Sequence, residues 1–344
     1  MKIRVVQVAE KNGPLHLAER NLPEPGPGEV RVKVEACGVC HSDSLTVEGL
    51  IPGLTFPRVP GHEIAGRIDA VGDGVQGWPV GKRVGVGWFG GACYRCEPCR
   101  RGDMINCRNL RIPGISYDGG YAEAMVCPAD ALAAMPDDLD SVEAAPLLCA
   151  GITTFNALRH SGALPGDVVA ILGVGGLGHL GIQFAAKMGF RTFAIGRGGD
   201  KDDLAIKLGA ERYIDSSKED PAAALQAFGG AQTILATVPS GNAVSPLIAG
   251  LGSRGKLIVI GVSPEPIETP SFVMVGKSAS VVGHASGTSI ESEDTLRFSA
   301  MSGIRPMIES VPLEQAPEAY AKMMRGDARF RMVLTMGRTA PAAR

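Results

Sequence analysis

The hydrophobic pattern of this chain changes character near residue 148. Before that point the apolar residues come in short alternating runs. The clearest run is GEVRVKVEA, in which valines and charged residues take turns from Val30 to Glu35. A period of two is typical of a strand with one buried face. Residues 1–148 are therefore predicted to form a β-rich domain.

After Pro146 the pattern is that of strands alternating with helices. A continuous apolar run, Val168–Leu172, precedes several glycines and then apolar residues at helical spacing from Leu177 to Met188. Strand-like runs recur at RTFAI, RYID, TILATV, KLIVIGV and SVVGHA, and helical segments such as DKDDLAIKLGA and DPAAALQAFGG separate them. This alternation predicts an α/β fold built on a doubly wound parallel sheet.

A glycine motif lies at the first junction of strand and helix. Gly173, Gly175 and Gly178 form GxGxxG directly after the apolar run, and Gly176 and Leu177 complete the loop. In this context the backbone can approach a pyrophosphate, whose negative charge the helix N-terminus faces. The motif predicts a dinucleotide site. The alternative is that these glycines serve only the tight packing of helix on strand.

The end of the second strand bears on the choice of cofactor. An enzyme selective for NAD usually has Asp or Glu about 20 residues after the motif, where it binds the ribose diol and repels a 2′-phosphate. This chain has Gly196 followed by Arg197, which removes the repulsion and supplies a guanidinium for the phosphate. NADP(H) is therefore favoured over NAD(H), and a solvated Arg197 in an NAD enzyme is the alternative. Val262, at the end of KLIVIGV, is also expected to bind the cofactor.

Composition narrows the class of protein. The 344 residues are 45% hydrophobic and carry a formal net charge of −2, which suits a folded protein of about two domains. Neither the start, MKIRVVQVAEKNGP, nor any later stretch has the apolar length that a signal peptide or a bilayer span requires. A cytoplasmic protein with no membrane partner is expected.

Four cysteines lie close together in the segment GACYRCEPCRRGDMINC. The spacing of Cys93, Cys96, Cys99 and Cys107 lets four thiolates surround one tetrahedral ion, so a structural zinc lobe is predicted at about residues 91–112. The intervening arginines would offset the negative charge of that site. Four unrelated thiols are the alternative, because disulfides are rare in a reducing cytoplasm. Nucleic-acid binding by this lobe is disfavoured, since the chain is not basic and only 5% aromatic.

Two further fragments, CGVCHSD (37–43) and PGHEIAG (60–66), contain residue types that bind metals. Together with the four-cysteine lobe and the later nucleotide motif, they resemble the zinc-dependent alcohol dehydrogenases of the medium-chain dehydrogenase/reductase superfamily. The resemblance covers nearly the whole chain in order. It implies a GroES-like catalytic domain made of residues 1–148 and 286–344, with a Rossmann domain at residues 149–285 between them.

The resemblance also implies a second, catalytic zinc site. Cys40, His62 and Cys149 resemble its three protein ligands, which leave a fourth position open for water or substrate. Asp43 resembles the carboxylate that orients the ligating histidine. Glu63 is similar to the acidic residue that lies behind the metal.

Other family positions are matched by residues around these ligands. Ser42 resembles the hydroxyl that contacts the substrate oxygen, and Trp88 resembles the aromatic wall of a small-alcohol pocket. His41 and Arg331 are similar to residues that contact the cofactor pyrophosphate, and Thr153 to one beside the nicotinamide.

The activity that the resemblance implies is NAD(P)-dependent oxidation of a small primary alcohol, or reduction of an aldehyde, by a homotetramer or homodimer. Many relatives have a proton-relay histidine where this chain has Leu45, so the proton is expected to leave through the ribose hydroxyl and water, or through His41. Polyol or amino-alcohol substrates are the alternative among enzymes, which Trp88 disfavours. A non-catalytic, zinc-stabilised nucleotide-binding protein is the alternative outside enzymes.

Overall fold

The alternating valine run lies in strand β3 (Glu29–Val39) of a seven-stranded sheet. The side chains of Val30, Val32 and Val34 are buried while Lys33 is exposed, which confirms the predicted strand with one buried face. The sheet has the order β14-β15-β3-β4-β5-β7, and β6 also pairs with β3. Its other strands are β4 (Ile64–Val71), β5 (Arg83–Val86), β6 (Ala124–Pro128), β7 (Leu132–Ala134), β14 (Ile308–Pro312) and β15 (Arg331–Thr335).

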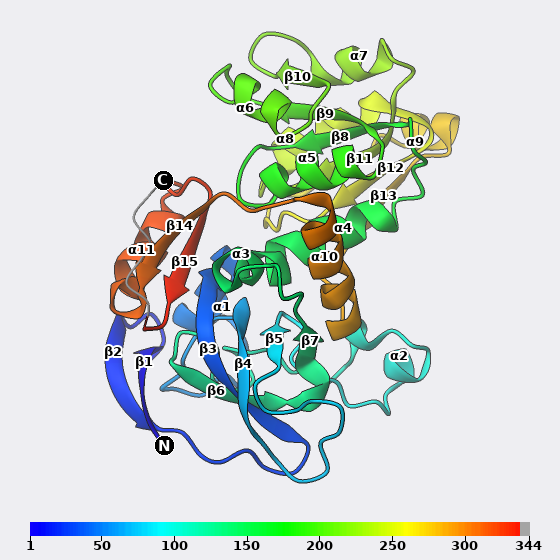
Figure 1. Cartoon of the computed structure of the whole chain (residues 1–344). Coiled ribbons are helices and arrows are strands. Elements are labelled where there is room, and N and C mark those ends of the chain that lie inside the picture. The colour runs from blue at the N-terminus through cyan, green and yellow to red at the C-terminus, as the bar shows by residue number, and fades with distance from the viewer. Residues whose placement is uncertain (338–344) are drawn as a thin grey trace. The chain divides into compact units, whose positions relative to one another are not determined.

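This sheet joins distant parts of the chain. Strand β15 pairs antiparallel with β3, with Met332 opposite Val39. The hydrophobic core under the sheet also includes side chains of β1 (Lys2–Val8), which pairs antiparallel with β2 (Leu15–Asn21). Figure 1 shows the late strands β14 and β15 beside the early strands of the same sheet.

The second sheet contains the six strands predicted after Pro146. All pair in parallel in the order β10-β9-β8-β11-β12-β13. From β8 outward, β9 and β10 follow in sequence on one side, and β11, β12 and β13 follow in sequence on the other. This is the doubly wound order of dinucleotide-binding folds. The strands are β8 (Val168–Leu172), β9 (Arg191–Gly196), β10 (Arg212–Asp215), β11 (Ala231–Ala236), β12 (Leu251–Val259) and β13 (Ser280–Gly283).

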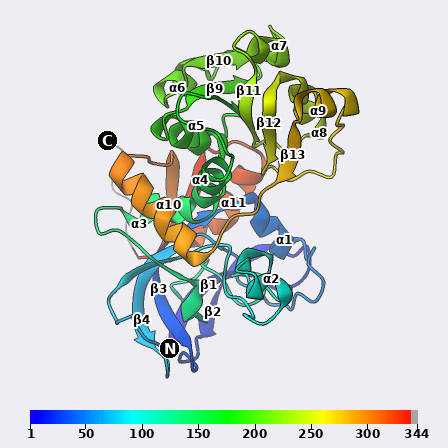
Figure 2. The same ribbon diagram turned by 90° about the vertical axis from the view of Figure 1, so that its right-hand side faces the viewer.

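Helices cover these sheets and connect their strands. In the doubly wound part, α5 contacts β8 and β9, and α9 packs against β12 near the outermost strand β13 (Figure 2). None of the helices within residues 1–337 is long and apolar enough to cross a membrane. They are α1 (Ser44–Val47), α2 (Glu97–Arg100), α3 (Ser141–Pro146), α4 (Ile152–Arg159), α5 (Gly178–Lys187), α6 (Asp202–Lys207), α7 (Pro221–Gln226), α8 (Gly241–Val244), α9 (Ser271–Lys277), α10 (Ser289–Ser302) and α11 (Ala316–Met324).

The computed structural model describes residues 1–337. The sequence also predicts a frayed C-terminal segment, TAPAAR, which lies outside the described residues. The chain divides into two units, Met1–Ile152 with the residues from Ser286 onward, and Thr153–Ala285. The first boundary between the two units thus lies after Ile152, whereas the sequence predicts it after residue 148. The reason is that the π-helical turn Leu147–Gly151 packs against α3 and α10 of the first unit.

Candidate metal centres and cofactor site

The end of β3 and the start of β4 bring Cys40 and His62 together. The two strands pair antiparallel, so the residues just beyond Val39 and just before Ile64 lie at the same edge of the sheet. Cys149 joins them from the π-helical turn. The ligand atoms of Cys40, His62, Glu63 and Cys149 all lie within 4.8 Å of one another.

The donor set of this cluster fits a zinc ion. The two sulfur atoms, of Cys40 and Cys149, are 3.9 Å apart, close to the separation of about 3.8 Å that two thiolates have around a tetrahedral zinc. The Nε2 atom of His62 is buried and has no hydrogen-bond partner among the described residues. A buried imidazole nitrogen without a partner is costly unless a metal takes that place. Two sulfurs and one imidazole are donors that zinc prefers.

Asp43 fixes the orientation of His62. Its Oδ1 atom lies 2.9 Å from His62 Nδ1, which leaves Nε2 as the nitrogen that faces the cluster. Its Oδ2 atom accepts hydrogen bonds from the backbone N–H of Cys40 and from the Tyr121 hydroxyl, both at 2.9 Å. Burial lowers the pKa of His62, but the Asp43 carboxylate outweighs it and raises that pKa well above its usual value. Tyr121 was not predicted as a site residue, because nothing in its local pattern points to a carboxylate far away in the chain.

Glu63, whose carboxylate belongs to the same cluster, forms a buried ion pair with Arg331, the first residue of β15. Burial raises the pKa of Glu63 to about 7, although the guanidinium opposes this shift. The pair needs a glycine beside it, since a Cβ atom on Gly38 would lie 1.8 Å from Glu63 Oε2. Arg331 was expected at the cofactor pyrophosphate, and its pairing with Glu63 was not foreseen.

The two thiols of the cluster lie within hydrogen-bonding distance of each other. This contact lowers the pKa of Cys40 and raises that of Cys149, so that Cys40 is the one that more readily becomes a thiolate. A divalent cation would displace the remaining proton, as metal binding to thiols generally does.

The other residues predicted for this site lie on nearby turns. His41 is exposed and Ser42 half-buried in the 3₁₀ turn His41–Asp43, which follows Cys40 directly. The ring of Trp88 stands edge-on to the His62 ring, at an interplanar angle of 88° and a centroid distance of 5.0 Å. Trp88 thus places an apolar surface next to one of the three proposed ligands.

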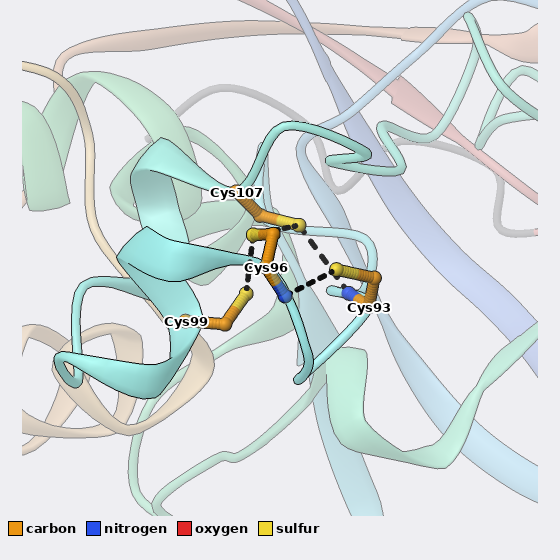
Figure 3. A group of neighbouring side chains, drawn as sticks. All are labelled: Cys93, Cys96, Cys99 and Cys107. Atoms are coloured by element: carbon orange, nitrogen blue, oxygen red, sulfur yellow. Dashed lines mark hydrogen bonds between the residues drawn. The ribbon is translucent and has the colours of Figure 1, made fainter.

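The four-cysteine lobe forms a second cluster (Figure 3). The sulfur atoms of Cys93, Cys96, Cys99 and Cys107 lie within 4.8 Å of one another. The distance from Cys96 Sγ is 3.4 Å to Cys99 Sγ and 3.8 Å to Cys107 Sγ. These distances suit a tetrahedral ion held by four thiolates.

Backbone N–H groups of the lobe are directed at its sulfur atoms. The N–H groups of Cys93 and Asn109 each donate to Cys107 Sγ at 3.3 Å. Those of Arg95 and Cys96 lower the pKa of Cys93 to about 6. The expected charge compensation by arginines is less direct, because Arg101 and Arg108 pair with Glu97 and Arg111 lies over the Tyr117 ring.

The GxGxxG loop joins β8 to α5. A Cβ atom on Gly178 would lie 1.8 Å from the carbonyl oxygen of Gly173, so only glycine fits at this close approach. At Gly175, by contrast, no described atom lies within 4 Å of such a Cβ, and the backbone is open to a ligand. Gly176 and Leu177 are half-buried in the same loop. Close packing at one glycine and an open backbone at another fit a pyrophosphate-binding turn.

The remaining residues predicted to bind the cofactor belong to the Thr153–Ala285 unit. Gly196 ends β9, and the exposed Arg197 follows it. Val262 lies beyond β12 and is 91% exposed, and Thr153 is half-buried in α4.

Comparisons with known proteins agree with these features. Residues 26–137 match the family model described as alcohol dehydrogenase GroES-like domain, and residues 176–301 match the one described as zinc-binding dehydrogenase. The chain is 46% identical to alcohol dehydrogenase patD of Penicillium expansum over 95% of its own length and 96% of that protein.

Solved structures of similar proteins share the fold. A structure described as an NAD-dependent alcohol dehydrogenase superposes with a TM-score of 0.89 at 29% identity, covering 97% of this chain and 100% of the other. The CAD structure from Helicobacter pylori, complexed with NADP(H), gives a TM-score of 0.86 at 26% identity and covers 99% of both chains.

Proposed function

Since this chain belongs to the zinc-dependent alcohol dehydrogenases of the medium-chain dehydrogenase/reductase superfamily, we propose that Cys40, His62 and Cys149 bind its catalytic zinc. The observation that carries this proposal is the convergence of their ligand atoms, with that of Glu63, within 4.8 Å at a buried sheet edge. We also assign a structural zinc to Cys93, Cys96, Cys99 and Cys107.

The protein is an oxidoreductase that acts on alcohols, with zinc and a nicotinamide coenzyme. When bound, the zinc polarises an alcohol or carbonyl oxygen and the nicotinamide exchanges a hydride with the substrate carbon. Asp43 holds His62 in the tautomer that presents Nε2, and Arg331 pairs with the Glu63 carboxylate beside the three proposed ligands.

The residues after Cys40 transfer the proton of the alcohol to solvent. The Ser42 hydroxyl can accept the proton of an alcohol and pass it on, and the exposed His41 beside it can release that proton to solvent. Leu45 offers no group for this purpose. The apolar ring of Trp88 beside His62 favours small primary alcohols and aldehydes over polyols.

The cofactor that we propose is NADP(H). Support comes from the absence of a carboxylate at Gly196 and from the exposed guanidinium of Arg197 directly after it.

We propose that the enzyme is a cytoplasmic homo-oligomer. Its eight free cysteines suit a reducing compartment. The exposed Phe272 and Val275 of α9, near the outermost strand β13, offer an apolar surface for a second copy.

The test compares two cysteine variants with the wild type. In Cys40→Ser we expect one zinc fewer per chain and a loss of at least about 100-fold in kcat for a primary alcohol, because a weaker ligand replaces a thiolate. Cys127→Ser is the control, since Cys127 is buried in β6 and belongs to neither metal cluster of the described chain. Full zinc content and full activity in Cys40→Ser would contradict the proposal.

A further inference from the structure

The side chain of Tyr213 fills the space in front of Gly196. Both residues lie on neighbouring parallel strands, and Asp215 at the end of β10 is opposite Gly196 at the end of β9. A Cβ atom on Gly196 would lie 2.2 Å from the Tyr213 hydroxyl oxygen, 2.9 Å from Cζ and 3.0 Å from Cε2. Tyr213 is itself only 9% exposed, so its ring cannot move aside freely.

The same side chain holds the segment that follows Arg197. The Tyr213 hydroxyl donates to the carbonyl oxygen of Gly198 at 2.7 Å, and the backbone N–H of Gly198 donates to Asp215 Oδ1 at 2.8 Å. Both polar groups of Gly198 are thus bound to residues of β10. Burial raises the pKa of Tyr213, so its hydroxyl remains a donor at neutral pH.

We propose that Tyr213 is a specificity-determining residue for the cofactor. It occupies the space that a ribose-binding carboxylate at position 196 would need, and it holds the loop of Arg197 through Gly198. This inference rests on the proposed use of NADP(H). A carboxylate at the end of the second strand is what selects NAD in dinucleotide folds. In this chain the selection therefore depends on a neighbouring strand as well as on the residue at position 196.

The first experiment measures the steric coupling of positions 196 and 213 without cofactor. We expect Gly196→Ala to lower the melting temperature by several degrees in the wild type, and to have little effect in a Tyr213→Val background, where the ring is gone. Gly199→Ala is the matched control in the same loop, because a Cβ there would approach only Lys218 Nζ, at 3.9 Å. Equal effects of Gly196→Ala in both backgrounds would overturn the inference.

The second experiment measures binding of NADPH and NADH by fluorescence titration. Gly196→Asp alone should lower the affinity for both cofactors. The double variant Gly196→Asp/Tyr213→Val is compared with Tyr213→Val. In the double variant, the ratio of the two dissociation constants should shift at least about tenfold in favour of NADH. Tyr213→Phe keeps the ring but not the donor, so NADPH affinity should fall about two- to tenfold and NADH affinity less.

The outcomes separate the two proposals. A shift toward NADH in Gly196→Asp alone, at unchanged melting temperature, would overturn the role of Tyr213 and leave the NADP(H) preference standing. If the wild type bound NADH more tightly than NADPH, the proposed preference for NADP(H) would be wrong. The proposed role of Tyr213 in cofactor selection would then be wrong as well. The melting temperatures would still show whether positions 196 and 213 are sterically coupled, because that experiment contains no cofactor.

Discussion

At the scale of single residues, Asp43 connects the proposed catalytic site to the rest of the first unit. It is 2% exposed, and its two oxygen atoms bind His62 Nδ1 on one side and the groups of Cys40 and Tyr121 on the other. A buried carboxylate is stable only when such donors surround it. The position of His62 therefore depends in part on Tyr121, which is not one of the clustered residues.

Tyr121→Phe tests this dependence. Removing the hydroxyl leaves Asp43 Oδ2 with one donor fewer, and we expect unfolding to require about 1–3 kcal/mol less free energy. Because His62 loses part of its support, zinc affinity should fall about 10–100-fold, measured by competition with a chelator. Tyr117→Phe is the control, since its hydroxyl donates to the Gly90 carbonyl, at 3.0 Å, and should leave zinc affinity unchanged. Unchanged zinc affinity in both variants would contradict the role of Tyr121.

At the scale of elements, the four-cysteine lobe contains little secondary structure. Its helix α2 spans four residues, and the 3₁₀ turn Met104–Asn106 spans three. Elements this short are not stable by themselves. Backbone N–H groups of Arg95 and Cys96 lower the pKa of Cys93. A cation bound by the four sulfurs would order the lobe.

Cys107→Ser should disorder this lobe and leave the doubly wound sheet folded. We expect one zinc fewer per chain and rapid tryptic cleavage near Arg100 and Arg101, which are exposed. Zinc content by mass spectrometry and limited proteolysis measure the two effects. Cys127→Ser, a substitution of a buried cysteine in β6, should retain both zincs and resist trypsin. A protease-resistant Cys107→Ser protein would show that the lobe does not need the cation.

The end of β10 provides a pH-dependent contribution to stability. Donation by the hydroxyl and N–H of Ser217, together with the N–H of Gly198, lowers the pKa of Asp215 from 3.8 to about 2. Since the folded pKa lies below the unfolded one, the stability that Asp215 contributes is present above about pH 4 and disappears as the pH falls toward 2.

Asp215→Asn should therefore be less stable than the wild type at neutral pH. The gap between their urea midpoints should remain constant down to about pH 4 and then narrow, because the protonated wild-type carboxyl loses its advantage. The comparison is made on metal-free protein, so that loss of zinc in acid affects both chains equally. A gap that stays constant below pH 4 would mean that the Asp215 charge contributes nothing.

At the scale of the whole molecule, the first unit is assembled from both ends of the chain. Glu63 and Arg331 are 268 residues apart in sequence, yet they form a buried ion pair where β15 lies along β3. A buried charge that loses its partner is strongly destabilising, whereas removal of both charges is often tolerated. The ion pair thus connects β15, near the C-terminal end of the described chain, with the segment before β4.

Arg331→Leu should leave the buried Glu63 without its partner and destabilise the protein by about 3–5 kcal/mol in urea unfolding. Adding Glu63→Gln should recover most of this loss, because the double variant has no unpaired charge. If Arg331→Leu alone were as stable as the wild type, or if the second substitution recovered nothing, the pair would not be what holds β15 in place.

Features that depend on near neighbours in the chain were predictable from local sequence pattern. The alternating valines of β3, the six strands of the parallel sheet and the glycine turn before α5 follow from local periodicity, and the structure confirms them. The CxxCxxC spacing likewise brings three cysteines of the lobe together, because two intervening residues allow neighbouring thiolates to turn toward one centre. The sequence places the domain boundary after residue 148, whereas the described structure divides after Ile152, because the π-helical turn Leu147–Gly151 packs with the first unit.

Contacts between side chains that are distant in sequence depend on the folded chain. Tyr121 reaches Asp43, Arg331 pairs with Glu63, and the Tyr213 ring covers Gly196. Each contact depends on the register between strands or on the packing of one segment against another, and a local pattern contains no information about either. The residues that could bind the metal were therefore recognisable from the sequence, while those that hold them in position became visible only in the fold.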